Sequence, residues 1–253
     1  MRQLLNIFLV ITTFTLGAQN KTHEKLSLNF EYSKHQYAMD SLNKHYLDYY
    51  INELEFLDDQ IKFGYNVSFG INYRPSSKFD FGIRIGYQYA STQKTIQTEI
   101  YGISPQPIET DMLNLVKVNS TNICLSSSFY LSSLIDFFER NNILNRLGIA
   151  LEGSLGIGFN QSVAYVHYSN PEIPYSYSFN FAETSNRALF SQLGCKSEFR
   201  TTNNPILTAI GFKFGYQFFR TGLLKFKSSE EVYLPINLDF SGFYYGIYLK
   251  LGK

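Results

Sequence analysis

The sequence predicts an all-β protein, an eight-stranded antiparallel up-and-down transmembrane β-barrel with long outer loops. Three observations predict this fold: apolar and polar residues alternate in eight segments, the connections between them alternate in length, and the N-terminus resembles an export signal. Of the 253 residues, 17% are charged and 17% are aromatic. Because soluble domains carry about 25% charged residues, this composition does not suit a soluble enzyme. The formal net charge of +1 gives no electrostatic reason to expect a nucleic-acid partner.

Residues 1–18 have the pattern of a secretory signal peptide. Arg2 precedes an apolar run that ends in the small residues Gly17 and Ala18, and this order is typical of a cleaved signal. We expect cleavage after Ala18, which leaves residues 19–253 as the barrel domain. An uncleaved anchor is the alternative, but the run is short for a helical span of about 20 residues. No later run reaches about 18 apolar residues, so a membrane form must cross as a closed barrel.

The clearest strands form a predicted hairpin over residues 63–89. Large apolar residues occupy every second position of residues 63–73, and small or polar residues lie between them. After the turn at residues 75–78, residues 79–89 repeat the pattern. Alternation with a period of two predicts a strand whose two faces differ, and two such runs around a short turn predict a hairpin.

Six further segments show the same alternation. They are residues 26–33, 122–131, 149–160, 189–200, 208–218 and 243–251. Just before the last of them, Ile236, Leu238 and Phe240 have the opposite parity. This change of parity suggests a β-bulge near Gly242.

The connections alternate in length as they do in outer-membrane barrels. Residues 75–78 and 201–206 are short connections, residues 132–147 are intermediate, and residues 34–61, 91–114, 165–187 and 220–235 are long. Bacterial outer-membrane barrels have an even strand count, short periplasmic turns and longer outer loops. The segment from residue 35 to residue 60 could form a helical turn over the mouth or extend the first two strands, and the sequence leaves both possibilities open.

The apolar face of the strands is expected to meet lipid. It carries many Phe and Tyr residues, which are too bulky for the interior of an eight-stranded barrel, whereas the other face is rich in Gly, Ser and Asn. A secreted soluble lipocalin-like binding barrel is the alternative, but its outer surface should carry more Lys and Glu. Central burial of Phe69, Ile83 and Phe212 would favour that alternative. Aromatic residues near the strand ends are expected to form interface girdles: Tyr32, Tyr73, Phe79, Tyr89, Phe129, Phe199 and Phe218.

The inward face carries charges of both signs. They are Glu31, Arg84, Glu152, Lys196, Glu198, Arg200 and Lys213. Because buried charges persist only when they are paired, we expect a salt-bridged, plugged interior, with a narrow ion path as the alternative. Cys124 falls on the inward face and Cys195 on the outward face, so no disulfide is expected between them.

With the signal pattern, the strand count and the final strand Gly242–Leu251 in view, the chain resembles the small outer-membrane β-barrel domain proteins, PorT-like and OmpA/OmpX-like. The resemblance covers roughly residues 24–253 and is one of pattern. It implies an outer-membrane location more than an activity. Since the sequence has no Gly-rich phosphate loop, His-Glu-x-x-His string or Cys-x-x-Cys pair, we expect no cofactor and no metal. The ending Gly252-Lys253 departs from the terminal Phe that is common in such barrels.

One short string is similar to a catalytic motif. His167-Tyr168-Ser169-Asn170 resembles the His-x-Ser-Asn string of PagL-type lipid A deacylases. The resemblance implies Ser169 as nucleophile, His167 as base, and Glu172 or Glu183 as the orienting carboxylate. If lipid contact ends near Phe159, however, His167 lies roughly 20 Å above it, which favours a solvated loop and a non-enzymatic protein.

The long loop around residue 175 is rich in aromatic residues. We expect Tyr165, Tyr168, Tyr175, Tyr177 and Phe179 to bind a partner outside the cell, unless they pack against neighbouring loops. The expected partners are outer-membrane lipid and lipopolysaccharide, and other envelope proteins are also considered. Together these observations favour a structural, binding or assembly role through the outer loops.

Overall fold

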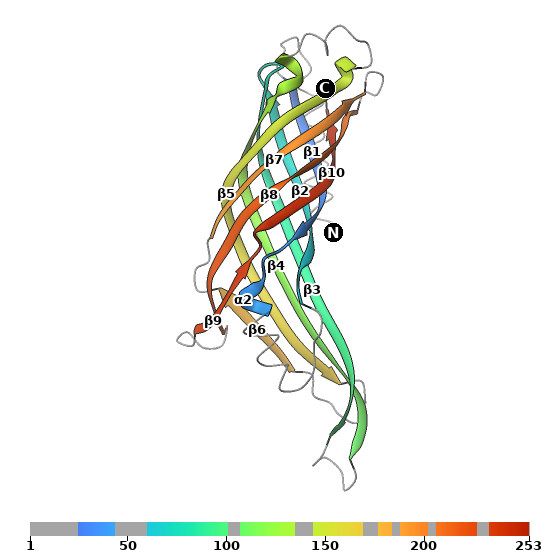
Figure 1. Ribbon diagram of the computed structural model, residues 1–253, viewed down its shortest axis with the longest axis vertical. Coiled ribbons are helices and arrows are strands. Elements are labelled where there is room, and N and C mark those ends of the chain that lie inside the picture. Colours follow the sequence, from blue (N-terminus) through green and yellow to red (C-terminus); the bar gives the residue numbers. More distant parts are fainter. Residues whose placement is uncertain are drawn as a thin grey trace.

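The protein is a closed antiparallel barrel of eight strands (Figure 1). The computed structural model describes residues 25–43, 60–100, 107–134, 144–168, 177–183, 188–201, 206–226 and 233–252. The barrel strands are β1 (Lys25–Gln36), β2 (Phe63–Arg74), β3 (Phe79–Ile100), β4 (Ile108–Tyr130), β5 (Leu147–Tyr168), β7 (Ala188–Arg200), β8 (Leu207–Phe226) and β10 (Gly242–Leu251). Strand β10 pairs with both β8 and β1, which closes the ring. The predicted fold class is therefore confirmed, and the predicted signal peptide lies outside the described residues.

In three of the predicted long loops, most of the residues that the structure describes are in strands. Strands β3 and β4 continue as one hairpin up to the pair Ile100↔Ile108. Strand β6 (Tyr177–Glu183) pairs with the outer part of β5, and β9 (Tyr233–Asp239) pairs with the outer part of β8. In Figure 1 the β3–β4 hairpin projects farthest, at the end opposite the C-terminus. The strands extend farther into these connections than the sequence predicted, because the ladder continues where the apolar alternation stops.

Short helical segments lie at both ends of the barrel. Helix α2 (Asp40–Leu42) follows β1 at the end of the long hairpins. The 3₁₀ segments η2 (Leu131–Leu134) and η3 (Leu144–Arg146) lie in the connection from β4 to β5. Among the described residues, no helix is both long enough and apolar enough to cross a membrane.

The apolar side chains of the barrel point outward. Ile83 and Phe212 are 57% and 43% exposed, and Phe69 is half-buried. The next residues along the same strands, Arg84 and Lys213, are 8% and 2% exposed and point inward. This arrangement confirms the predicted orientation and excludes the lipocalin-like barrel, whose apolar side chains would line the interior.

The outward apolar surface forms a belt of limited height. On β3 its exposed residues run from Phe79 to Tyr87 and the half-buried Tyr89 forms its edge. The distance from Phe79 to Tyr89 corresponds to about 33 Å along the strand and about 25 Å across a membrane for a strand tilted by about 40°. Outer-membrane barrels have an apolar band of about 25 Å. Beyond Tyr89 the exposed outward residues of β3 are polar: Ser91, Gln93, Thr95, Gln97 and Glu99.

Aromatic rings gather near both edges of this belt. Phe79 and Phe129 lie 5.1 Å apart, between ring centroids, near the short turns. Tyr32 and Tyr65 stack at 5.8 Å toward the other edge. Their places are those of the interface girdles of membrane barrels.

The expected bulge at Gly242 is not present. Even-numbered residues point inward on both sides of this glycine, because Leu238 and Phe240 are fully buried and Tyr244 is 2% exposed. The pairing with β8 also keeps its register from β9 to β10. Arg220 pairs with Asp239 and Gln217 pairs with Gly242, so both strands advance by three residues and neither has an extra one. The apolar residues therefore change from even to odd positions because the interior changes from apolar to polar, and not because the strand has a bulge. Gly242 itself has a φ of +152°, and a Cβ there would collide with the carbonyl group of Gln36.

Candidate functional site

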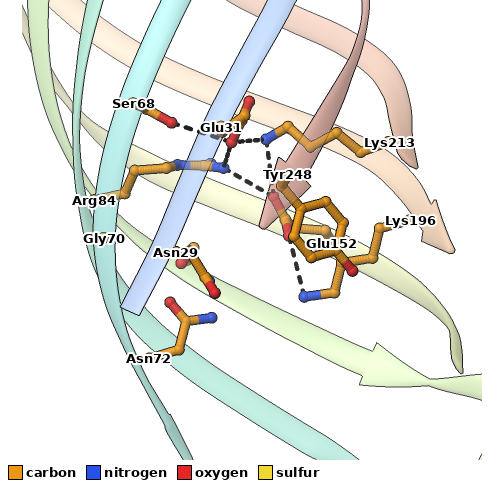
Figure 2. Close-up of a pocket in the computed structure, with 11 residues that line it drawn as sticks. Asn29, Glu31, Ser68, Gly70, Asn72, Arg84, Glu152, Lys196, Lys213 and Tyr248 are labelled. Carbon is orange, nitrogen blue, oxygen red and sulfur yellow. Dashed lines mark hydrogen bonds and ion pairs between the residues drawn. The ribbon is translucent and has the colours of Figure 1, made fainter. Parts of the chain in front are cut away.

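Arg84 of β3 lies at the centre of a buried ion cluster (Figure 2). Its guanidinium is 3.0 Å from a carboxylate oxygen of Glu31 on β1 and 3.0 Å from one of Glu152 on β5. The Lys213 ammonium lies between the same two residues, at 2.5 Å from Glu31 and 3.5 Å from Glu152. Lys196 adds a further contact of 3.3 Å to Glu152. We call these five side chains the central cluster.

Neutral side chains complete the hydrogen bonds of the central cluster. The second terminal nitrogen of Arg84 donates to the hydroxyl of Ser154 at 2.5 Å and to the amide oxygen of Gln192 at 2.9 Å. The hydroxyl of Ser68 donates to Glu31 at 3.1 Å. Buried ion pairs are stable only when such secondary bonds satisfy the remaining polar atoms. The small residues that alternate with apolar ones in the sequence therefore leave room for charged side chains and also supply their partners.

A second set of polar contacts lies nearer the short turns. Glu198 accepts hydrogen bonds from the hydroxyls of Tyr130 and Tyr248 at 3.0 and 3.1 Å. Arg200 lies 3.0 Å and Arg74 lies 3.4 Å from the same carboxylate. The guanidinium carbon of Arg74 is also 4.0 Å from the centre of the Tyr130 ring. The sequence analysis placed Glu198 in one charge network with Glu31, Arg84 and Glu152. In the structure, Glu198 belongs to a separate layer.

The same layer contains an ion pair that the sequence reasoning missed. The Lys250 ammonium lies 2.7 Å from the Asp80 carboxylate. Both residues occupy inward positions of the predicted alternation, as do Arg74, Tyr130 and Tyr248. Their inward position in the alternation was a sufficient signal to include them. We give the name turn-side cluster to the seven side chains of this layer: Arg74, Asp80, Tyr130, Glu198, Arg200, Tyr248 and Lys250.

Three glutamines separate the central cluster from the outer part of the interior. The amide oxygen of Gln217 accepts hydrogen bonds from Gln88 at 2.7 Å and from Gln192 at 2.9 Å. The amide nitrogen of Gln217 donates to the backbone oxygen of Phe240 at 2.8 Å. All three glutamines are buried. This layer therefore joins the ionic half of the interior to an apolar half.

The outer half of the interior is filled by a buried apolar cluster that we call the outer plug. Its members are Tyr37, Met39, Leu42, Ile61, Ala90, Val116, Val118, Ala188, Phe190, Phe219, Ile236, Leu238 and Phe240. The buried Cys124, which pairs with Arg84 in the sheet register, joins this cluster to the central cluster. Phe219 is its centre, with ring centroids 5.6 Å from Phe190 and 5.4 Å from Phe240. The ring of Tyr37 meets Phe240 edge-on at 5.2 Å.

The segment between β1 and β2 supplies four residues of the outer plug and is tied down by hydrogen bonds. The side chain of Asn43 donates to the backbone oxygen of Ile61 at 3.2 Å and accepts from its amide at 2.9 Å. The hydroxyl of Ser41 accepts a hydrogen bond from the backbone N–H of Asn237 at 3.2 Å. The ends of this segment therefore fold across the mouth, with α2 forming a short helical turn there, and residues 44–59 lie outside the described residues.

Only two of the predicted catalytic residues, His167 and Glu183, lie in the part of the chain that the structure describes. His167 pairs with Leu113 near the outer end of β5. Glu183 lies one position beyond the pair Gln161↔Ala182. Its backbone is therefore seven strand positions, or about 23 Å, from the backbone of His167 along the sheet. Ser169 and Glu172 lie outside the described residues.

Four of the five predicted binding aromatics have their backbones in one hairpin. Tyr165 pairs with Ser178, and Val166 pairs with Tyr177, so Tyr165, Tyr168, Tyr177 and Phe179 belong to β5 and β6. Tyr175 lies outside the described residues. Both cysteines are free, as expected. Within the described ranges, no group of three or more His, Cys, Asp or Glu residues is placed to hold a metal ion.

Comparisons with known proteins give matches among solved structures. No protein-family model matches the sequence, and no curated protein sequence matches it. Among solved structures, Ail of Yersinia pestis, in complex with the heparin analogue sucrose octasulfate, is 14% identical, with 90% of this chain and 99% of that chain covered and a TM-score of 0.37. OprG of Pseudomonas aeruginosa is 11% identical over 93% and 99% of the two chains, with a TM-score of 0.38. A major outer membrane protein of Thermus thermophilus is 9% identical over 89% and 99%, with a TM-score of 0.39.

The assignment of the fold rests on this chain's own structure. Its ladder is closed, its apolar belt faces outward, and its charges face inward. A chain can cross a membrane with strands only as a closed barrel, and an outward apolar band around a polar interior is the pattern of outer-membrane barrels. The protein is therefore a transmembrane β-barrel of the outer-membrane type.

Proposed function

We propose that the protein is a non-enzymatic, non-conducting outer-membrane barrel that holds its outer hairpins beyond the membrane to bind envelope components. The observation that carries this proposal is a change along β3. The apolar belt ends at Tyr89, yet the strand continues to Ile100 with a polar outward face. At the same level the interior becomes a packed apolar cluster.

The filled interior supports the non-conducting part of the proposal. Arg84 and Lys213 join both carboxylates of the central cluster across the barrel, and Leu238 and Phe240 of the outer plug are fully buried. The cavity beside Arg84 measures about 20 Å³, which is space for about one water molecule. A continuous water column through these layers would require side chains of both halves to move.

The outer hairpins support the binding part of the proposal. Strands β3, β4, β5 and β6 form one continuous sheet beyond the belt, as the register Gln93↔Leu115↔Tyr165↔Ser178 shows. On β3 the outward side chains of this sheet are hydroxyls, amides and one carboxylate. Such groups donate and accept hydrogen bonds, which suits the sugars of lipopolysaccharide, the partner we propose first.

A shortened hairpin tests the binding role. Residues 96–112 are replaced by an Asn-Gly turn that joins the pair Thr95↔Leu113, a turn type that suits a two-residue hairpin. We expect this variant to form the same barrel, since the belt and the outer plug stay intact, and to lose at least tenfold in affinity for purified lipopolysaccharide in nanodiscs. Equal affinity of the shortened and full-length proteins would overturn the proposed role of this hairpin.

Conductance in planar bilayers tests the closed interior separately. We expect the full-length protein to show no stable conducting state at moderate voltage. Steady channel activity would contradict the non-conducting part of the proposal and would leave the binding part to be judged by the hairpin variant.

No specific observation favours the hydrolase. The sheet register separates the backbones of His167 and Glu183, which does not support a catalytic pair of these two residues. We therefore propose a binding role for the outer hairpins. Mass spectrometry of lipid A from cells that express the protein or its Ser169→Ala variant checks this point, and we expect identical acyl patterns. Loss of an acyl chain with the native protein alone would establish an enzyme.

A further inference from the structure

The central cluster contains more cations than carboxylates. Arg84, Lys196 and Lys213 are 8%, 4% and 2% exposed, and their ion-pair partners in the central cluster are Glu31 and Glu152. If all five groups are ionised, one positive charge is left without a carboxylate. A buried charge without a counter-charge is strongly unfavourable in a low-dielectric interior.

The neighbouring layer does not offset this excess. In the turn-side cluster, Arg74, Arg200 and Lys250 face the two carboxylates of Asp80 and Glu198. Among the described side chains of this layer, cations again outnumber carboxylates by one. On the other side, the described polar side chains include the amides of Gln88, Gln192 and Gln217 and the buried side chains of Ser33, His35 and Asn66, and none of these is a carboxylate.

A small cavity lies against the cation with the fewest carboxylate contacts. Lys196 has one ion pair of 3.3 Å within the central cluster, to Glu152, and its ammonium lies 5.3 and 5.8 Å from the ring centres of Tyr130 and Tyr248, although an ammonium has three donors. The cavity of about 20 Å³ is lined by Lys196 and by the polar side chains of Asn29, Asn72 and Ser126. In Figure 2 the Lys196 ammonium and the amides of Asn29 and Asn72 lie around the same space.

We infer that this cavity is a binding site for one small monatomic anion of the chloride class. The anion balances the excess charge, accepting hydrogen bonds from Lys196 and from the amide of Asn72 or the hydroxyl of Ser126. The oxygen of the Asn29 amide is buried without a hydrogen-bond partner, so this amide turns its NH₂ group toward the anion. Glu31 and Glu152 also line the cavity, but their oxygens are engaged by Arg84, Lys213 and Lys196. The site is independent of the proposed function of the hairpins, and it links the stability of the barrel to halide.

Unfolding in different salts tests the site. The full-length protein is refolded and unfolded by urea in detergent, in sodium chloride or in sodium methanesulfonate at equal ionic strength. For one site in the folded state, each tenfold rise in chloride above the dissociation constant should lower the unfolding equilibrium constant tenfold. An unfolding constant that does not respond to chloride would overturn the inference.

Two matched variants separate the site from general salt effects. Lys196→Met removes the excess charge while Glu152 keeps Arg84 and Lys213 as partners, so we expect it to fold and to lose the chloride dependence. Lys78→Met changes an exposed lysine in the β2–β3 turn and should keep the dependence. Equal chloride dependence in Lys196→Met and native protein would contradict the site.

Bromide locates the anion directly and does not depend on any variant. Crystals of the full-length protein grown in sodium bromide should show one anomalous peak between Lys196 and the amides of Asn29 and Asn72. The absence of anomalous signal there, with a light atom in its place, would show that the cavity holds water and would overturn the inference.

Discussion

The two halves of the barrel interior are filled by opposite chemistry. In the half surrounded by the apolar belt, ions and hydroxyls fill the inside, with Arg84 at the centre. In the half beyond the belt, apolar side chains fill the inside, with Phe219 at the centre. On β3 the switch takes a few residues: Tyr87 is exposed and Gln88 buried, and then Ala90 is buried and Ser91 exposed.

This switch shows that the surrounding solvent decides which face of a strand is apolar. Lipid accepts apolar side chains, so within the belt the polar residues turn inward and must satisfy one another. Water accepts polar side chains, so beyond the belt the strands follow the rule of soluble proteins and bury their apolar face. The two halves should therefore respond differently to substitution.

The largest effect is expected from Arg84→Met in the ionic half. The substitution leaves Glu31 and Glu152 close together with fewer cations and removes bonds to Ser154 and Gln192. Breaking a buried ion network by removing one partner costs about 3–5 kcal/mol, and we expect the free energy of unfolding in urea to fall by this amount. The double variant Arg84→Met with Glu31→Gln should recover part of the loss, because it removes one unpaired carboxylate. A loss below about 0.5 kcal/mol, the size of a surface effect, would contradict the account of the ionic half.

A smaller effect is expected from Leu238→Ala in the apolar half. Leu238 is fully buried in the outer plug, and truncation of a buried leucine leaves a cavity that costs about 2–5 kcal/mol. We expect about 3 kcal/mol, because β9 lies at the rim of the barrel and can partly relax. Leu193→Ala is the matched control, since this leucine is 64% exposed on the outside of β7. In detergent, equal losses for the two variants would show that the outer plug is not a packed core.

The smallest effect is expected from a glycine that lies beneath the outer plug. A Cβ at Gly158 would collide with the Phe219 ring, whereas a Cβ at Gly153 would meet only Leu193, at 3.6 Å. Overpacking of this kind costs about 1–3 kcal/mol, so Gly158→Ala should lower the free energy of unfolding and Gly153→Ala should leave it nearly unchanged. The urea midpoints of the two variants measure the difference, and equal midpoints would mean that Phe219 does not occupy this place.

Much of the ionic half could be predicted from the sequence, because the belt imposes a strict alternation. Each barrel strand was found, and its inward positions were assigned correctly. Asp80 and Lys250 were left out of the expected charge network although their parity placed them inside. The pairing itself could not be predicted, because the contact between Arg84 and Glu152 joins strands that are not neighbours in the ring.

The outer half was predicted poorly for a physical reason. Beyond Tyr89 the outward positions of β3 are Ser, Gln, Thr and Glu, so the apolar alternation that marks a strand within lipid disappears although the hydrogen-bonded ladder continues. Tyr37, Met39 and Ile61 looked like loop residues, because they become buried only when the segment folds across the mouth. The opposite parity of Ile236, Leu238 and Phe240 was the one signal of an apolar interior, and it was assigned to a bulge.

Site-directed spin labelling along β3 tests the central claim most directly. In a background with Cys124 and Cys195 replaced by serine, single nitroxide labels are placed in turn at Ile83, Ile85, Gln93 and Thr95 of the protein in lipid bilayers. The account predicts that the first two labels collide with oxygen and not with a water-soluble nickel chelate, whereas the last two collide with the chelate. Shielding of Ile83 and Ile85 from both reagents, or chelate access at these two positions, would contradict a barrel whose apolar face meets lipid and whose belt ends at Tyr89.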